Sequence, residues 1–256
     1  MPGFSFETAE RTHVGCVRKL NEDRVLSRPE VGLWAVADGM GGHQAGDLAS
    51  SMIVDALGAI ELLGTGYAFL DEVQESVQRV NRTLVSHARL SRPGTVIGST
   101  LVALLVYDGH FACLWAGDSR VYLLRDGRLN QITRDHSMVQ ELIDSGALQR
   151  ADAPYYGRSN VITRAVGVND RLALDIASGP IQEGDVFLLC SDGLTAMMED
   201  NEIEATLKAR AADDAAEHLL KVSLDRGAKD NVSLILVHVE PSVDDTLRTA
   251  RRTLLA

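Results

Sequence analysis

The sequence lacks paired cysteines, long apolar runs and an excess of positive charge. Its cysteines, Cys16, Cys113 and Cys190, lie far apart and form no CxxC pair. This spacing favours buried thiols in a reducing compartment over a disulfide scaffold or a structural zinc site. We predict that Cys16, too, is a small buried thiol and not a nucleophile.

The longest apolar runs, residues 101–106 and 186–190, have the length of strands and are too short to cross a bilayer. Residues 1–12 alternate polar and apolar side chains and lack the apolar core of a signal peptide. The net charge of −11 argues against a general nucleic-acid binder, which would carry a basic patch or stripe. We therefore expect a soluble, cytoplasmic protein that binds neither nucleic acid nor membrane, and we expect a monomer.

The 256 residues contain no low-complexity linker, composition shift or internal repeat, so we expect one domain over residues 1–256. Apolar residues at steps of three and four predict helices at 46–61 and 69–90. Further helices are predicted at 137–144, 202–208, 213–224 and 246–255. Strands are predicted at 4–12, 24–27, 32–37, 99–106, 111–116, 120–125, 129–132, 172–176, 186–190 and 232–239.

Short turn signals separate the four strands between residues 99 and 132, which predicts an antiparallel meander. Residues 147–160 contain Pro154 and Gly157 and are typical of a surface loop. The predicted fold class is α+β, with two antiparallel sheets packed together and helices outside.

Acidic residues recur where predicted strands begin or end. Asp38-Gly39 follows the apolar residues 33–36, and Asp192-Gly193 follows residues 186–191 in the same way. If the two strands are neighbours, their carboxylates meet at one sheet edge. Other acids stand beside strands at Glu22, Asp23, Asp118 and Asp230.

Several ionised carboxylates cannot share a site without a cation, because like charges raise each other's pKa. Oxygen ligands without histidine suit hard ions such as Mg²⁺ or Mn²⁺ better than zinc or copper. Each acid taken singly has an alternative interpretation as a turn or helix-cap residue. That alternative is much weaker for the whole set than for any one acid.

Five segments in order carry a resemblance to the metal-dependent type-2C protein serine/threonine phosphatases, in their bacterial form. They are Val14-Gly15-Cys16-Val17-Arg18-Lys19-Leu20-Asn21-Glu22-Asp23, Ala37-Asp38-Gly39-Met40-Gly41-Gly42-His43, Gly117-Asp118-Ser119-Arg120, Cys190-Ser191-Asp192-Gly193-Leu194 and Lys229-Asp230-Asn231-Val232. The resemblance covers residues 12–239. It implies a four-layer αββα fold, in which helix pairs flank a β-sandwich.

The resemblance also implies a role for each acid. Asp38 would bridge two Mn²⁺ or Mg²⁺ ions, the Gly39 carbonyl would bind one of them, and Asp192 and Asp230 would complete the other. Glu22 and Asp23 would hold water molecules on the ions. Asp118 would form a third, weaker metal site with Asp192, and Arg18 would bind the substrate phosphate.

Two positions depart from the family pattern. Met40 stands where animal members carry a histidine proposed as the general acid, and His13 stands where bacterial relatives often carry an acid. His43 follows three residues after Met40, and we interpret it as a packing residue at a helix start. We prefer water on the metal as the proton donor.

A segment at about residues 138–165 falls where the family places its flap near the site. It would contact the phosphoprotein substrate, although a plain surface loop remains an equal alternative. Arg164 matches an arginine that often follows the flap, and we assign it no catalytic role. We interpret His136 as a structural residue that caps the helix beside Asp135.

The predicted function is hydrolysis of phosphoserine and phosphothreonine in proteins, opposing a bacterial serine/threonine kinase. Two alternatives stay open. One is a phosphatase-like regulatory module that binds phosphoprotein without turnover, and the other is a phosphatase of a small phosphorylated molecule.

Overall fold

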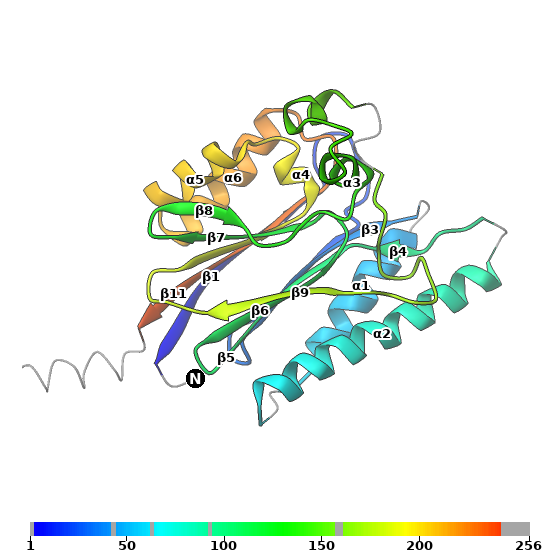
Figure 1. Ribbon diagram of the computed structural model, residues 1–256, viewed down its shortest axis with the longest axis horizontal. Coiled ribbons are helices and arrows are strands. Elements are labelled where there is room, and N and C mark those ends of the chain that lie inside the picture. The colour runs from blue at the N-terminus through cyan, green and yellow to red at the C-terminus, as the bar shows by residue number, and fades with distance from the viewer. Residues whose placement is uncertain (1–2, 42–44, 62–63, 92–93, 157–160, 242–256) are drawn as a thin grey trace, which may run out of the picture.

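The computed structural model describes residues 3–41, 45–61, 64–91, 94–156 and 161–241, and it contains two antiparallel sheets packed face to face (Figure 1). The first sheet has the strand order β1 (Phe4–His13), β11 (Val232–Pro241), β10 (Val186–Cys190), β7 (Arg120–Arg125) and β8 (Arg128–Gln131). The second has the order β2 (Asp23–Arg28), β3 (Leu33–Met40), β5 (Leu101–Tyr107), β6 (His110–Ala116) and β9 (Asp175–Pro180), with β4 (Gly98–Ser99) beside the end of β3.

Helices cover the outer face of each sheet, which confirms the predicted α+β class and its four layers. The second sheet carries α1 (Ala45–Gly58) and α2 (Gly66–Leu90). The first carries α4 (Asp192–Thr195), α5 (Asp200–Ala209) and α6 (Ala212–Asp225). Between β8 and β9 the chain forms α3 (Met138–Asp144) and a 3-10 helix at Arg150–Tyr155. No helix among the described residues is long and apolar enough to span a membrane.

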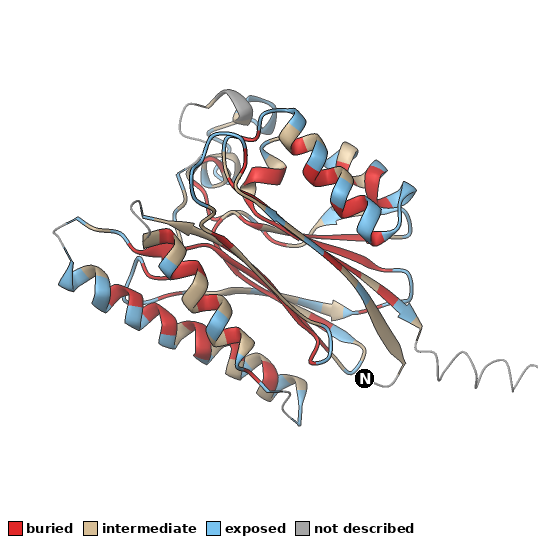
Figure 2. Cartoon of the chain, turned by 180° about the vertical axis from the view of Figure 1, so that it is seen from behind, coloured by how far each residue is buried: buried red, intermediate tan, exposed pale blue. Residues whose placement is uncertain are grey.

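Alternation along the strands separates the core into three apolar layers. In β3, Leu33 packs against α1 and α2, whereas the next residue, Trp34, faces the other sheet. Phe187 of β10 meets that middle layer from the opposite side, and both Trp34 and Phe187 are fully buried. Figure 2 shows buried residues along the strands and on the inward faces of the helices.

The structure corrects the predicted meander. Strands β5 and β6 pair in the second sheet and β7 and β8 pair in the first, so the chain changes sheets between Ala116 and Arg120. Gly117 has φ +115°, and a Cβ there would lie 2.6 Å from the side chain of Thr100. The sequence signal at Gly117 and Asp118 does mark a turn, but the strands that it joins, β6 and β7, belong to different sheets.

Two other expectations also need correction. The strand predicted at 172–176 begins later, at Asp175, and Leu172 instead packs in the layer under α1 and α2 from outside the strand. Cys16 is exposed, unlike the buried Cys113 and Cys190. The helix predicted at 246–255 lies outside the described residues.

Candidate metal centre

The predicted site residues meet at one end of the sandwich, in a pocket of about 270 Å³. The pocket is lined by every residue of the predicted set except Asp23: Arg18, Glu22, Asp38, Gly39, Asp118, Asp192 and Asp230. Asp23 is 1% exposed and pairs across the ladder with Asp38, so it lies beside the pocket wall. These acids come from both sheets and meet where the sheets stack. The strands before Asp38 and Asp192 are not neighbours in one sheet, so the condition for a meeting at one sheet edge is not met.

Asp38 and Gly39 lie inside β3, which continues to Met40. The amide of Asp38 donates to Thr100 Oγ1 at 3.1 Å, and its carbonyl accepts from the amide of Thr100 at 2.8 Å. A Cβ at Gly39 would lie 2.2 Å from the carbonyl oxygen of Gly46, so only glycine allows α1 to begin this close to the strand. The backbone around Asp38 is therefore fixed from two sides.

Asp192 is positioned at the first turn of α4, directly after the end of β10. A Cβ at Gly193 would lie 1.9 Å from the carbonyl oxygen of Asn231, so this glycine lets the two acidic segments approach each other. The Ser191 hydroxyl donates to Asp23 Oδ2 at 2.8 Å and links the first sheet to the second. The main chains that carry Asp192 and Asp230 thus pack directly together.

Asp118 lies in the crossing between the sheets, where His136 holds the turn. The amide of Gly117 donates to His136 Nδ1 at 3.2 Å, and the amide of His136 donates to the Gly117 carbonyl at 2.9 Å. Ser137, and not His136, is the N-cap of α3, which corrects the predicted capping role. His136 is structural, as predicted, but it supports the Asp118 turn.

Burial and mutual repulsion raise the pKa values of the clustered carboxyls. The pKa rises to about 6 for Asp23 and Asp192 and to about 7 for Asp118, in each case mainly through burial. The pKa of Asp38 is raised well above its ordinary value by burial and then by Asp23, Asp192, Asp118 and Asp230. Arg18 and Arg120 lower the pKa of Asp192 but do not offset the effect of burial.

The donor set fits hard divalent cations. Three buried carboxylate oxygens, Glu22 Oε1, Asp23 Oδ1 and Asp192 Oδ1, have no hydrogen-bond partner among the residues that the structure describes. An ionised oxygen left in this state is costly, and a cation would satisfy it. All the acidic ligands are oxygen donors, which suit Mg²⁺ or Mn²⁺.

The carboxylates surround the pocket without closing on one point. Within the described ranges, no three acidic, histidine or cysteine side chains already form a ligand cluster. Asp230 Oδ2 accepts from Arg18 Nη2 at 2.6 Å. Like charges separate or share protons when no cation lies between them.

Arg18 extends into the pocket from the loop between β1 and β2, and its side chain is 52% exposed. The hydrogen bond to Asp230 raises its pKa, so the guanidinium is charged. An exposed arginine at the mouth of an acidic pocket can bind an anion whose other oxygens face cations.

Sequence reasoning missed Thr100, Ile162 and Asn231, which also line the pocket. Asn231 Oδ1 accepts from the Glu22 amide at 2.8 Å, and its Nδ2 donates to the carbonyls of Val14 and Leu20 at 3.0 and 2.9 Å. It thereby fixes the loop that carries Arg18. Its place beside Asp230 was the available signal, whereas nothing in the sequence around Thr100 indicates a site.

The flap-like segment is joined at its base, and its end reaches the pocket. The Met138 amide donates to the Val161 carbonyl at 2.9 Å, and Ile162 lines the pocket. Arg164 forms an ion pair with Asp175 and does not line the pocket. His43 and residues 157–160 lie outside the described residues.

The sequence is similar to those of known proteins along most of its length. The family described as Protein phosphatase 2C matches residues 17–233. The serine/threonine phosphatase stp of Listeria monocytogenes is 36% identical over 235 residues, which cover 89% of this chain and 93% of the relative.

Two solved structures have similar folds. PppA, described as a key regulatory component of T6SS in Pseudomonas aeruginosa, is 43% identical, with a TM-score of 0.86 over 92% of this chain and 98% of the other. The catalytic domain of the serine/threonine protein phosphatase PstP, in complex with two manganese ions, is 33% identical. Its TM-score is 0.83 over 93% of this chain and 99% of the other.

Proposed function

The chain belongs to the protein phosphatase 2C family and is a serine/threonine protein phosphatase, and we propose that it acts with two Mn²⁺ or Mg²⁺ ions held by the carboxylates of its pocket. Asp38 would bridge the ions, with the Gly39 carbonyl on one and Asp192 and Asp230 on the other. Glu22 and Asp23 would hold water molecules on them. The observation that carries this proposal is the set of buried carboxylate oxygens without partners.

A pair of divalent cations supplies an activated water and positive charge for the phosphoryl oxygens. Arg18 would bind the phosphate through its planar guanidinium, sharing or releasing Asp230 as it does so. Met40 lines the pocket and carries no transferable proton, so the proton for the leaving alcohol comes from elsewhere. Among the described lining residues there is no histidine, which favours water as the donor.

We assign Asp118 to a third, weaker cation site shared with Asp192. The charge of Asp192 is the second cause, after burial, of the raised pKa of Asp118. A cation there would reduce the repulsion between Asp118 and Asp192. We further propose that residues 1–256 form a single catalytic domain, active as a monomer, with a flap at about residues 138–165.

The substrates would be proteins phosphorylated by a serine/threonine kinase of the same cell, which this enzyme opposes. Relatives named as serine/threonine phosphatases support that substrate class. The pocket is open enough to expose Arg18, which suits a side-chain phosphate presented by a large molecule.

A comparison of substrates tests the proposed function. With saturating Mn²⁺, kcat/KM for a phosphothreonine peptide should exceed that for small phosphorylated metabolites by about tenfold or more, because a peptide adds contacts outside the pocket. Phosphate release measures both rates. Faster turnover of a small molecule would favour the small-phosphate alternative, and metal binding without any turnover would favour a binding module.

Replacement of Arg18 tests its role in phosphate binding. Arg18→Ala should raise KM for the phosphopeptide about tenfold, the size of one charge-assisted hydrogen bond, with a smaller change in kcat. Arg18→Lys should recover only part of the affinity, because lysine keeps the charge and loses the fork. Lys19→Ala, at the exposed neighbouring position, is the control. An unchanged KM in Arg18→Ala would remove this role.

A further inference from the structure

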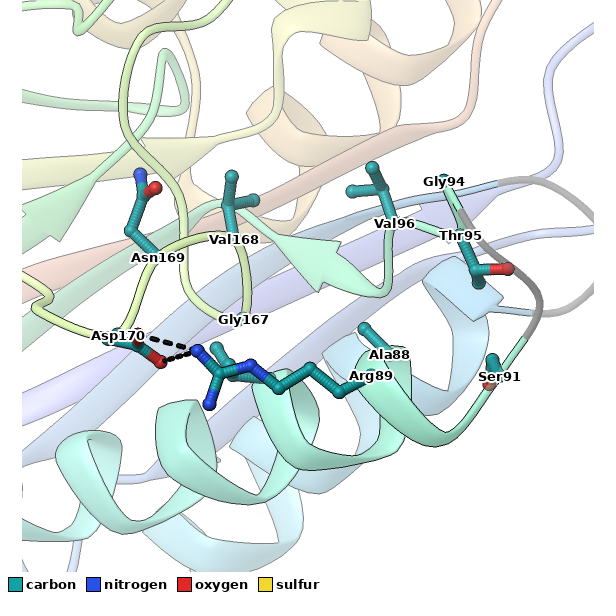
Figure 3. Close-up of a pocket in the computed structure, with 11 residues that line it drawn as sticks. Ala88, Arg89, Ser91, Gly94, Thr95, Val96, Gly167, Val168, Asn169 and Asp170 are labelled. Atoms are coloured by element: carbon teal, nitrogen blue, oxygen red, sulfur yellow. Dashed lines mark hydrogen bonds and ion pairs between the residues drawn. The ribbon is translucent and has the colours of Figure 1, made fainter.

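A second pocket, of about 460 Å³, lies between the C-terminal half of α2 and two segments at residues 94–96 and 167–170 (Figure 3). It shares no lining residue with the carboxylate pocket. Nothing in the proposed chemistry uses it. We refer to it below as the α2 groove.

The α2 groove and the carboxylate pocket lie next to each other. A Cβ at Gly98 would lie 3.0 Å from Met40 Cε and 3.1 Å from Val168 Cγ2, so these side chains meet over Gly98. Met40 lines the carboxylate pocket and Val168 lines the groove. The two pockets are therefore neighbours, separated by the side chains of Met40 and Val168.

The walls of the α2 groove are held in place without any ligand. Asn81 is fully buried, and its side chain donates to the Asn169 carbonyl at 2.9 Å and accepts from the Gly167 amide at 2.7 Å. Gly167 has φ +89°, and a Cβ there would lie 2.3 Å from the Ile97 carbonyl oxygen. The segment 167–170 is thus fixed against α2, and a ligand would meet a preformed surface.

The α2 groove offers both apolar and charged contacts. Val96 and Val168 are 44% and 41% exposed and both line the groove, so they offer it an apolar contact. Arg89 reaches from α2 to Asp170, and its Nη2 alone donates to both carboxylate oxygens, at 2.7 and 2.6 Å. Its Nε and Nη1 donate to no acceptor among the described residues, so they can receive a second anionic group.

The charge along α2 favours an acidic ligand. All three acids of this helix precede Ser76, whereas residues 76–90 contain Arg79, Arg82 and Arg89 and no acid. Arg82 stands seven residues before Arg89, on the same face by helical spacing. The whole chain carries a net charge of −11, so this basic stretch is a local exception.

We propose that the α2 groove binds the substrate polypeptide on one side of its phosphorylated residue. An acidic residue of the substrate pairs with Arg89, and an apolar side chain lies between Val96 and Val168. This specificity rests on the proposed phosphatase function and adds a sequence preference to it.

Peptides with a scanned acid test the charged contact. A phosphothreonine peptide carries one Asp, moved through successive positions on both sides of the phosphorylated residue, with Asn peptides as references. At one or two positions the wild type should show a KM about fivefold lower with Asp, the size expected for one partly exposed ion pair. Arg89→Gln should abolish this preference and leave kcat and hydrolysis of p-nitrophenyl phosphate unchanged.

Arg79→Gln is the matched control, since Arg79 lies on the same helix, is ion-paired with Glu72 and is not among the lining residues of the groove. It should keep the preference for Asp. Val168→Thr should raise KM about two- to threefold for peptides with a leucine beside the acid. Ile176→Thr changes a similarly exposed β-branched residue on β9, and it should leave this KM unchanged.

The outcomes separate the two proposals. If the wild type is active on phosphopeptides but shows no preference for the acid, the α2 groove proposal alone is overturned. The same holds if Arg79→Gln loses the preference as fully as Arg89→Gln does. A wild type that hydrolyses no phosphopeptide at any metal concentration overturns the proposed function, and the groove proposal with it.

Discussion

Asp38→Asn should lower kcat/KM for phosphopeptides by about a thousandfold or more while leaving the fold intact. The expected loss corresponds to about 4 kcal/mol of transition-state stabilisation, the scale of one major electrostatic contribution in an active site. Asp38 lies among four other carboxylates, and it is the proposed ligand shared by both cations. Phosphate-release kinetics measure the effect.

Thermal unfolding separates this result from misfolding. Asparagine has nearly the shape of aspartate. It removes the Asp38 carboxyl, whose pKa is already raised by burial and by repulsion from neighbouring acids. The metal-free variant should therefore be no less stable than the metal-free wild type, and it should gain less stability from Mn²⁺. Asp213→Asn, which removes an exposed acid paired with Arg11, should leave activity unchanged. Activity of Asp38→Asn within tenfold of the wild type would contradict the shared-ligand role.

Removal of divalent metal should abolish activity, and addition of Mn²⁺ should restore it. The proposed mechanism needs the cations to activate water, and no cysteine or histidine lines the described part of the pocket. Dialysis against chelator followed by titration with Mn²⁺ and Mg²⁺ measures the dependence. Full activity in excess chelator would eliminate the two-metal mechanism.

The same titration should change stability in a pH-dependent way. At 100-fold excess over its dissociation constant, a bound cation stabilises the fold by about 2.7 kcal/mol. The raised pKa values of about 6 for Asp23 and Asp192 and about 7 for Asp118 mean that the folded, metal-free protein takes up protons before the unfolded chain does. The repulsion between these carboxylates in the metal-free protein therefore falls as the pH is lowered from 8 towards 6. Over the same range, cations must compete with protons for the carboxylates.

The gap in melting temperature between the loaded and the chelated protein should accordingly narrow over that range. Calorimetry at several pH values measures it. A gap that widens on acidification would show that these carboxylates do not hold the cations.

The strands and helices could be predicted closely because their signals are local. The apolar spacing in residues 69–90 predicted α2, although the helix begins earlier, at Gly66, where the Thr65 hydroxyl accepts from the Ala68 amide. The strand before Asp38 was also predicted, but β3 continues through Gly39 to Met40. That extension pairs with β4, in which Ser99 was assigned to the following strand and Gly98 carries no strand signal.

Errors arose where a long-range contact decides the outcome. The sequence left open whether the two Asp-Gly pairs follow neighbouring strands, and β3 and β10 in fact belong to different sheets. Cys16 was expected to be buried, yet it lies in an exposed loop held by Asn231, more than two hundred residues away. Local sequence contains no information on either pairing.

The sequence by itself determined which chemistry is present: ordered acids beside strands, an arginine ahead of them, and glycines that admit close backbone contact. It also determined the layers, since periodicity selects the face that each element buries. Only the tertiary structure decided that the acids converge from two sheets, that burial raises their pKa values, and that the α2 groove adjoins their pocket. Proximity and desolvation arise from contacts between segments far apart in the chain, and these exist only once the sheets have packed.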